Sequence, residues 1–453
     1  MTHLMYDLLV RDADLLVTMD GDDVPGGWIA VSGGTVAAIG GPGAEPAAAK
    51  TLSAKGSLVT PGLVNTHQHL FQNLTRGNAA AMNVDLFDWL KALYPMWAGL
   101  DEEAVEVSTY VGLAELALGG CTTSMDMLYV HTGPNFIDAQ VRAAQEVGIR
   151  FHATRGSMCL SQKDGGLAPD SVVQTPDEIL ADSERLVDKY HDRTPGAMVQ
   201  IGLAPCALAL VTPELMRDTA ELAERLDVRL HTHLSEVRAE DEYCARVFGK
   251  RPVEVFEDVG WGTDRAWVAH CVFPNADEIR RLGQWGTGVA HCPTPTLMRG
   301  AGPTPVPELR TAGVPVGIGC DSSTHSAHAS MWLEAHTALV ALKGRSGAGA
   351  ISARDVLEMA TTGSAACLGR ADLGRIRVGA PADLVVWELN PVAFAGAHSD
   401  LVEAWLRCGP VQARHTIVQG APVVESGELR LPRLDDMLAR HRRISRRLQG
   451  LAG

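Results

Sequence analysis

Strand-like apolar runs alternate with helix-like segments between residues 57 and 375, and eight strand candidates can be counted. Apart from one over residues 121–126, the candidates end near His67, Arg155, Ala204, His233, His270, His291 and Asp321. Eight strand-then-helix units in a chain of 453 residues predict an α/β fold, a (β/α)₈ TIM barrel. In such a barrel the chemistry takes place at the C-terminal ends of the strands.

The two ends of the chain carry a different pattern. Short apolar segments broken by glycine pairs fill residues 1–56, and similar segments recur after residue 376. This pattern is typical of small antiparallel strands joined by tight turns. Neither piece is long enough to bury a core alone, so we expect one small β-sandwich domain built from residues 1–56 and 376–453. The second part should also contain a C-terminal helix, and the barrel should occupy residues 57–375.

Composition excludes several classes of protein. Hydrophobic content of 46% and charged content of 21% are ordinary for a soluble globular protein, and the formal net charge of −15 argues against a nucleic-acid partner. A basic run at residues 441–447 is interpreted as a solvated helix face. No apolar run reaches membrane-spanning length, and no secretory signal is visible. Nine scattered cysteines indicate reduced thiols, so a cytoplasmic location is expected.

Polar residues gather at the predicted strand ends. His67 and His69 lie two residues apart, a spacing that would point both imidazoles to one face of a strand. Alone, this pair could also belong to a solvated polar loop, which is the less favoured of the two interpretations. His233, His270 and Asp321 stand at the ends of later strands. Because these ends meet on one face of a barrel, the converging set indicates a metal site.

These motifs resemble the amidohydrolase superfamily, in its metal-dependent aminohydrolase (deaminase) branch, over essentially the whole chain. The supporting motifs are Pro-Gly-Leu-Val-Asn-Thr-His-x-His at 61–69, His-Thr-His-x-x-Glu at 231–236, Ala-His-Cys at 269–271, His-Cys-Pro at 291–293 and Gly-x-Gly-x-Asp-Ser at 317–322. Segments 155–158, 164–174 and 203–206 are more specifically similar to bacterial 8-oxoguanine deaminases. Triazine hydrolases and isoxanthopterin deaminases share these features.

The resemblance implies that His67, His69, His233 and Asp321 bind one divalent metal ion. Three imidazoles and a carboxylate suit Zn²⁺ best, with Fe²⁺ as the alternative. Relatives that hydrolyse cyclic amides often hold two metals bridged by a modified lysine on the fourth strand. Residues 199–206 contain no lysine, so one metal is expected.

The resemblance also implies a mechanism. The metal lowers the pKa of its bound water, and hydroxide attacks the ring carbon that carries an amino group. Asp321 takes the water proton and His270 orients the hydroxide, while Glu236 protonates the neighbouring ring nitrogen. Asp321 then protonates the leaving amine, and ammonia departs. Glu236, His270 and Asp321 are therefore the predicted catalytic residues.

Three residues are candidates for substrate binding. Gln72 offers an amide to the edge of a purine-like ring, or it stabilises a loop. Arg155 either contacts a substrate carbonyl or pairs with Asp126, and Cys206 either lines the pocket or packs beside it. Residues 83–100 are interpreted as an apolar flap over the pocket or as a dimer surface. For His291 a supporting or packing role is expected.

Two loops differ from the 8-oxoguanine deaminases. One follows Asp321 and contains His325 and His328, and the other follows His291 and contains Arg299. Because loops at the barrel mouth determine specificity, the substrate is predicted only as a small heterocycle of the 8-oxoguanine, guanine or pterin type. A triazine-type hydrolase, a cyclic-amide hydrolase and an inactive binding protein are the alternatives. A homo-oligomer, dimer or larger, is expected.

Overall fold

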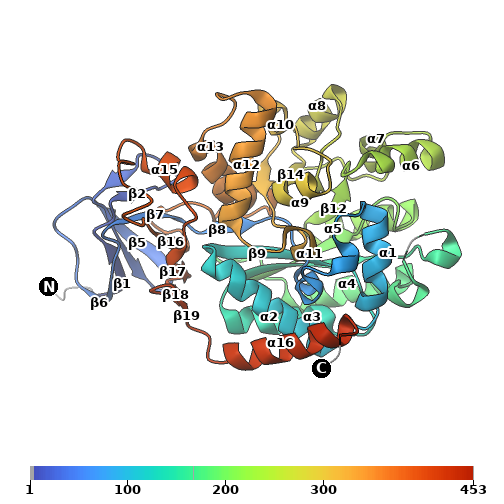
Figure 1. Cartoon of the computed structure of the whole chain (residues 1–453), viewed down its shortest axis with the longest axis horizontal. Coiled ribbons are helices and arrows are strands. Elements are labelled where there is room, and N and C mark those ends of the chain that lie inside the picture. Colours follow the sequence, from blue (N-terminus) through green and yellow to red (C-terminus); the bar gives the residue numbers. More distant parts are fainter. Residues whose placement is uncertain (1–4, 167, 452–453) are drawn as a thin grey trace.

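Eight parallel strands close into a barrel in the computed structural model (Figure 1), as predicted. The structure describes residues 5–166 and 168–451. In chain order the barrel strands are β8 (Leu63–Asn65), β9 (Cys121–Leu128), β10 (Arg150–Ser157), β11 (Val199–Pro205), β12 (Leu230–Leu234), β13 (Ala266–His270), β14 (Gly288–His291) and β15 (Val316–Ile318). The barrel closes where β15 pairs with β8. All eight C-terminal strand ends therefore lie at one mouth.

The first strand is shorter than predicted. Strand β8 ends at Asn65, so His67 and His69 lie just beyond it, and the alternation of a strand does not set their directions. A single bridge between Gln68 and Asp321 continues the pairing. The short 3₁₀ helix η1 (Leu70–Thr75) follows at once. The two histidines therefore belong to a tightly bound turn at the mouth.

Helices surround the barrel. The larger ones on its outside are α2 (Glu102–Leu118), α3 (Phe136–Val147), α4 (Pro176–Tyr190), α5 (Pro213–Leu226), α7 (Pro252–Asp258), α8 (Ala276–Trp285) and α12 (Met331–Ser346). Smaller helices α10 (Val306–Thr311), α13 (Ala353–Glu358) and α14 (Ser364–Cys367) follow the last strands of the barrel, whereas α1 (Leu86–Trp97), α6 (Arg238–Phe248), α9 (Pro293–Met298) and α11 (Ser323–Ser326) belong to segments that follow strand ends. Asp101 caps α2 by accepting from the N–H of Ala104 at 2.8 Å, as the sequence pattern predicts.

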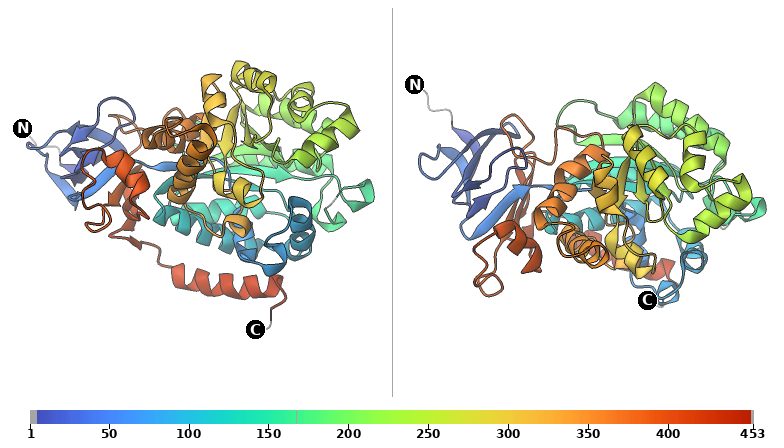
Figure 2. Two further views of the ribbon diagram at one scale, coloured as in Figure 1. Left: turned by 45° about the horizontal axis from the view of Figure 1, so that its top comes forward. Right: turned by 90° about the horizontal axis from the view of Figure 1, so that it is seen from above.

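Strands from both ends of the chain form two sheets beside the barrel (Figure 2). The four-stranded sheet has the order β5 (Thr35–Gly40), β4 (Trp28–Ser32), β1 (Tyr6–Arg11) and β6 (Ala48–Ser53). The seven-stranded sheet has the order β19 (Glu428–Leu429), β18 (Ala421–Glu425), β17 (Ala413–Val418), β16 (Leu384–Glu388), β7 (Ser57–Pro61), β2 (Leu15–Leu16) and β3 (Val24–Pro25). Residues from both sheets share one apolar core, which includes Leu8, Val31 and Leu384.

Two details of the sandwich differ from expectation. Strand β7 pairs with β16 and β2, so the first part of the sandwich extends to Pro61 rather than ending at residue 56. Only Gly62 separates β7 from barrel strand β8, and a Cβ atom there would lie 2.0 Å from Thr122 Oγ1. The apolar run is continuous, and its pattern cannot show where one sheet ends and the next begins. In addition, the β1–β6 and β2–β7 pairs are parallel, whereas we expected antiparallel strands throughout.

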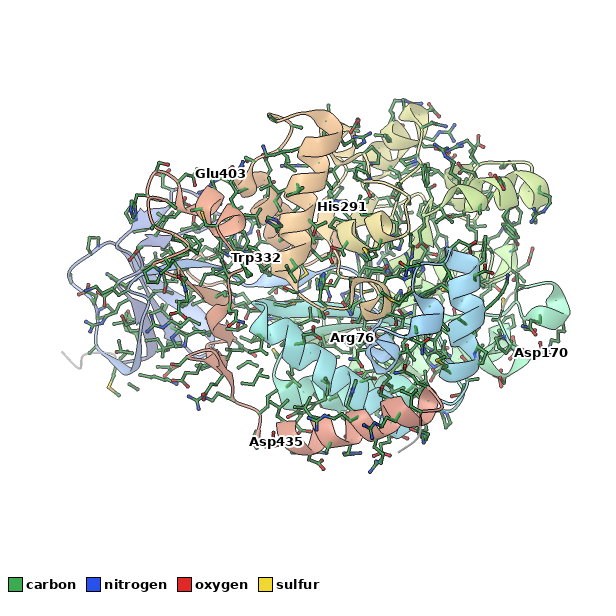
Figure 3. All side chains as sticks on the ribbon, in the orientation of Figure 1. Arg76, Asp170, His291, Trp332, Glu403 and Asp435 are labelled. Carbon is green, nitrogen blue, oxygen red and sulfur yellow. The ribbon has the colours of Figure 1, made fainter. Side chains whose placement is uncertain are left out.

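Buried polar contacts join the sandwich to the barrel. Arg150, on β10, donates from Nε to Asp383 Oδ2 at 2.6 Å, and its side chain is completely buried. Trp332 of α12, labelled in Figure 3, donates from its indole nitrogen to the carbonyl of Trp405 at 3.1 Å. Trp405 lies on α15 (Leu401–Arg407), which packs on β7. The two domains are therefore held by specific interactions.

The predicted C-terminal helix is present as α16 (Leu434–Leu448) and runs beneath the barrel along α2 (Figures 1 and 2). Its basic run is engaged within the chain, because Arg443 pairs with Glu103 and Arg447 pairs with Asp101, each at 2.7 Å. Across the residues that the structure describes, no helix is long and apolar enough to cross a membrane.

Candidate metal centre and active site

Four predicted ligands meet at the mouth of the barrel. Ligand atoms of His67, His69, His233 and Asp321 all lie within 4.8 Å of one another. Asp321 Oδ1 is 3.3 Å from His67 Nε2 and 3.4 Å from His69 Nε2. The Nε2 atoms of His69 and His233 are 3.2 Å apart. Four side chains from three barrel strand ends thus surround one point.

In His69 and His233, a backbone carbonyl determines which ring nitrogen faces the centre of the ligand cluster. His69 Nδ1 lies 2.8 Å from the carbonyl oxygen of Met127, and His233 Nδ1 lies 2.6 Å from that of Cys206. A carbonyl only accepts a hydrogen bond, so each Nδ1 carries the proton and each Nε2 keeps a free lone pair. Hydrogen bonds of this kind orient histidine ligands in metal sites.

His231, which is not one of the four predicted ligands, orients His67. His231 Nδ1 lies 2.9 Å from the carbonyl oxygen of Trp267, so this nitrogen donates and His231 Nε2 can accept. His67 Nδ1 is 2.8 Å from that Nε2 and therefore donates to it. His67 Nε2 is left to face Asp321. The sequence motif contains His231, but its supporting role was not predicted, since only the folded barrel reveals the carbonyl beyond it.

Protonation states fit a divalent cation. Burial lowers the pKa of His69 to about 3 and that of His67 well below its ordinary value. Burial raises the pKa of Asp321, but Arg299 and His67 offset this effect and hold the pKa well below its usual range. Neutral imidazoles and an ionised carboxylate are the donors that zinc prefers. The residues therefore fit a mononuclear metal site.

The remaining predicted catalytic residues lie beside this centre. Glu236 forms an ion pair with Arg299, and Glu236 Oε1 is 3.7 Å from His270 Nε2. His270 Nε2 is also 4.0 Å from Asp321 Oδ2, so the imidazole lies between two carboxylates. Burial raises the pKa of Glu236, but the charges of Arg299 and His270 more than offset it and lower the pKa below its ordinary value.

The two oxygens of Asp321 have different surroundings. Oδ1 faces His67 and His69, whereas Oδ2 is buried and has no hydrogen-bond partner within the described ranges. Arg299 lies 3.4 Å from Oδ2. One oxygen is thus placed to bind a metal while the other remains available to exchange a proton.

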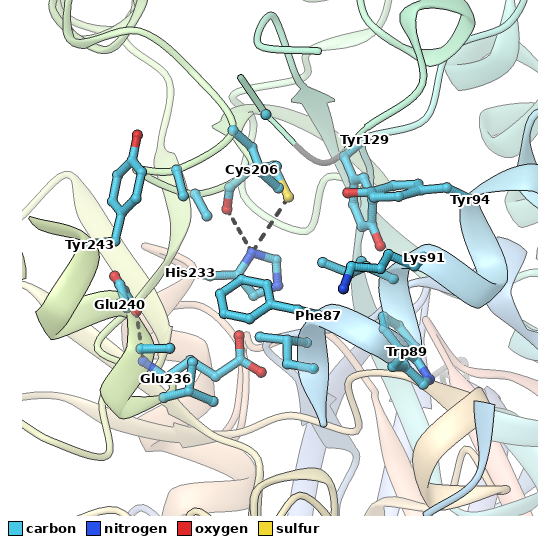
Figure 4. A pocket seen from close by; sticks show the side chains of 18 of the residues that line it. Phe87, Trp89, Lys91, Tyr94, Tyr129, Cys206, His233, Glu236, Glu240 and Tyr243 are labelled. Atoms are coloured by element: carbon cyan, nitrogen blue, oxygen red, sulfur yellow. Dashed lines mark hydrogen bonds between the residues drawn. The ribbon is translucent and has the colours of Figure 1, made fainter. Parts of the chain in front are cut away.

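A cavity of about 390 Å³ opens beside the metal ligands (Figure 4). His69, His233, Glu236 and Asp321 line its inner end. Helix α1 forms an aromatic wall with Phe87, Trp89 and Tyr94, and Tyr129, Glu240 and Tyr243 line other sides. The segment expected as a flap or dimer surface therefore covers the pocket.

Gln72 lines this cavity together with Tyr129. Its amide nitrogen donates to the Tyr129 hydroxyl at 2.8 Å, and its buried Oε1 has no partner in the part of the chain that the structure describes. The Gln72–Tyr129 pair therefore leaves one acceptor and one hydroxyl proton for a ligand. Sequence analysis missed Tyr129, although it immediately follows strand β9, where a pocket residue of a barrel is expected.

Of the other two substrate-binding candidates, one lines the cavity and one does not. Cys206 lines the cavity, with Sγ 3.8 Å from His233 Nδ1. Arg155 does not reach the cavity: its guanidinium donates to Asp182 at 2.7 Å and to Gln174 at 2.6 Å. The expected pairing of Arg155 with Asp126 is also wrong, because its partner Asp182 lies on helix α4.

The histidines of the divergent loops have distinct places. His325 packs against Trp89, and its Nδ1 lies 3.3 Å from Arg299 Nη2. His328 Nε2 is 3.5 Å from Glu334, outside the residues that line the cavity. His291 is fully buried, and neither ring nitrogen has a hydrogen-bond partner among residues 5–166 and 168–451. Arg299, whose loop was singled out in the sequence, contacts Glu236 and Asp321, the two carboxylates predicted to be catalytic.

Comparison with known proteins shows to which family the chain belongs. Residues 58–423 match the model of the amidohydrolase family. The chain is 45% identical to the 8-oxoguanine deaminase of Pseudomonas aeruginosa over 437 residues, covering 96% of this chain and 97% of that protein. It is 37% identical to the hydroxydechloroatrazine ethylaminohydrolase of a Pseudomonas species, covering 95% and 88%. The crystal structure of atrazine chlorohydrolase from Arthrobacter aurescens TC1 with zinc superposes with a TM-score of 0.92 at 32% identity, covering 97% of this chain and all of that one. The chain belongs to the amidohydrolase family.

Proposed function

We propose that the chain is a mononuclear zinc-dependent aminohydrolase that removes an amino group from an N-heterocycle of the 8-oxoguanine, guanine or pterin type. The convergence of His67, His69, His233 and Asp321 on one point carries this proposal, because three of them, His69, His233 and Asp321, also line a cavity. The similarity to an 8-oxoguanine deaminase over nearly the full length of both chains supports it.

Those four residues would hold the metal. Zinc is proposed because the ligand set is three imidazoles and one carboxylate, with iron(II) as the alternative. A bound zinc ion would supply a water molecule that ionises near neutral pH and acts as the nucleophile. Strand β11 contains no lysine, which supports one metal ion rather than two.

The carboxylates would move the two protons of the attacking water. Because Arg299 favours the ionised form of Glu236, Glu236 begins as a base: it accepts the first proton and delivers it to the ring nitrogen. Asp321 Oδ2 takes the second proton and passes it to the leaving amine. This order differs from the initial expectation, in which Glu236 served as the acid and Asp321 took the first proton. His270, between the two carboxylates, holds the water in line.

Gln72 and Tyr129 would recognise the ring. Their free acceptor and hydroxyl proton match a lactam, which presents one N–H and one carbonyl oxygen side by side. The aromatic wall of Trp89 and Tyr94 suits a flat ring system.

The test is to measure ammonia release by the zinc-loaded enzyme from purines, pterins, pyrimidines and triazines. We expect release from an oxo-substituted aminopurine or aminopterin, with one metal ion per chain. Removing the metal with a chelator should abolish activity, and adding zinc should restore it. If no ring amine releases ammonia from the loaded enzyme, the proposal fails.

A triazine-type hydrolase is the second candidate, favoured by the similarity to atrazine chlorohydrolase. The same residues could direct water to a triazine carbon that carries chloride or an alkylamine. The released product separates the two functions, because chloride or alkylamine would appear in place of ammonia.

A further inference from the structure

Glu236 is carried by a turn with an unusual backbone. Ser235, the residue before it, has φ of +51°, and His270, the last residue of the neighbouring strand β13, has φ of +71°. Side chains other than glycine rarely adopt this region, and such conformations persist only where surrounding contacts hold them. The position of the Glu236 carboxylate therefore depends on what fixes this turn.

The carbonyl side of the turn is fixed by the loop that follows strand β13. The N–H of Cys271 donates to the carbonyl of Leu234 at 3.0 Å, and the N–H of Val272 donates to the carbonyl of Ser235 at 2.9 Å. These bonds join the turn that carries Glu236 to the one that carries His270. They leave the N–H groups of the turn to be satisfied by something else.

Glu240 satisfies one of these groups. Its Oε2 accepts from the N–H of Glu236 at 2.9 Å (Figure 4). Glu240 is the third residue of α6, whose N-cap residue, Val237, makes no side-chain capping bond. A glutamate at this position commonly reaches back to the N-cap N–H. Here it reaches one residue further, to the catalytic glutamate itself.

Glu240 places a second carboxyl group beside Glu236. Burial of a carboxylate without a counter-charge costs free energy, so the ionised form of Glu240 would be unfavourable here. Glu240 lines the cavity wall, and its Oε1 has no hydrogen-bond partner within the residues that the structure describes. Burial raises the pKa of Glu240 to about 8. This shift favours the neutral form of the group, which reduces its repulsion of the Glu236 carboxylate.

We infer that Glu240 is a positioning residue, which holds the turn at Ser235 so that the Glu236 carboxylate stays between Arg299 and His270. This inference rests on the proposed function of Glu236. It predicts that the acceptor oxygen of residue 240 matters, whereas its negative charge does not.

The test compares Glu240→Ala and Glu240→Gln in the zinc-loaded enzyme, with Glu242→Ala as a matched control, since Glu242 is exposed on the same helix. We expect E240A to lower kcat about 10²-fold with KM little changed, because a small misplacement of a catalytic group has an effect of this size. E240Q keeps an acceptor oxygen and should retain most of the activity. E242A should behave as the wild type. Crystal structures should show the turn displaced in E240A and intact in E240Q.

Other outcomes overturn the inference. If E240A keeps the wild-type kcat, or raises only KM, Glu240 either has no role or contacts the substrate. A second contrary outcome is that E240Q and E240A lose kcat equally, although both keep the wild-type melting temperature and an undisplaced turn. The charge or the proton of Glu240 would then be what catalysis needs. An inactive wild type would instead refute the proposed function, and the crystal structures would still show whether Glu240 holds the turn.

Discussion

The guanidinium of Arg299 forms a buried ion pair with the carboxylate of Glu236, the predicted proton carrier. The Arg299 side chain is 4% exposed and also lies 5.5 Å above the Trp89 ring. Arg299, from the segment after β14, thus lowers the pKa of Glu236, from the segment after β12.

Removal of this guanidinium should shift the pH dependence of catalysis. Arg299 lowers the pKa of Glu236, so the pKa should rise in Arg299→Met. The acidic limb of the kcat/KM profile should then move to higher pH by about 1 unit or more. Arg299→Lys keeps a positive charge and should move the limb less. A profile for R299M that coincides with the wild type would show that Arg299 does not act on Glu236.

Neutralising Glu236 should separate chemistry from metal binding. In Glu236→Gln the amide cannot carry a proton from water to the ring, so kcat should fall by about 10²–10⁴-fold. Glu236 is not one of the four ligands, and metal content measured by elemental analysis should therefore remain at one ion per chain. Glu242→Gln, at an exposed position of helix α6, which begins two residues after Glu236, is the control. Substantial turnover by E236Q would exclude the proposed proton transfer.

Much of this arrangement follows from sequence pattern. Each predicted metal ligand, and the predicted catalytic residues Glu236 and His270, stand at or just after the end of a barrel strand, so recognising eight strands places them together. The pattern could not identify the partners of Arg155, because Asp182 and Gln174 are contributed by a distant segment. Tyr129 was missed because a single tyrosine after an apolar strand carries no periodic signal.

Loss of the supporting histidine should weaken metal binding. His231 accepts from His67 Nδ1 at 2.8 Å and stacks on Trp267. His231→Phe preserves the stacking but removes the acceptor, so metal affinity should fall about 10–100-fold. His152→Phe is a matched control, since His152 contacts the same tryptophan at 5.5 Å. Competition with a chromophoric chelator measures both, and equal affinities would contradict the role of His231.

Substrate recognition should depend jointly on Gln72 and Tyr129. Gln72→Leu leaves the substrate and Tyr129 without a partner, so kcat/KM for an oxo-substituted ring should fall by about 10–100-fold. Tyr129→Phe should cause a similar loss. Because the two residues act as one pair, the double variant should lose about as much kcat/KM as either single variant alone, which a double-mutant cycle tests. Strictly additive losses would show that each residue acts independently.

The fold itself should depend on the buried pair that joins barrel and sandwich. Arg150→Met leaves the Asp383 carboxylate with the N–H of Gln419 at 2.8 Å as a remaining donor, so the free energy of unfolding should fall by about 3–5 kcal/mol. In the double variant R150M/D383N the uncompensated charge is absent, and part of the loss should be recovered. Arg142→Met removes an exposed pair with Glu102 and should lower the free energy by less than about 1 kcal/mol. Urea denaturation of the metal-loaded proteins measures all three. If R150M were no less stable than R142M, the pair would not be what secures the sandwich to the barrel.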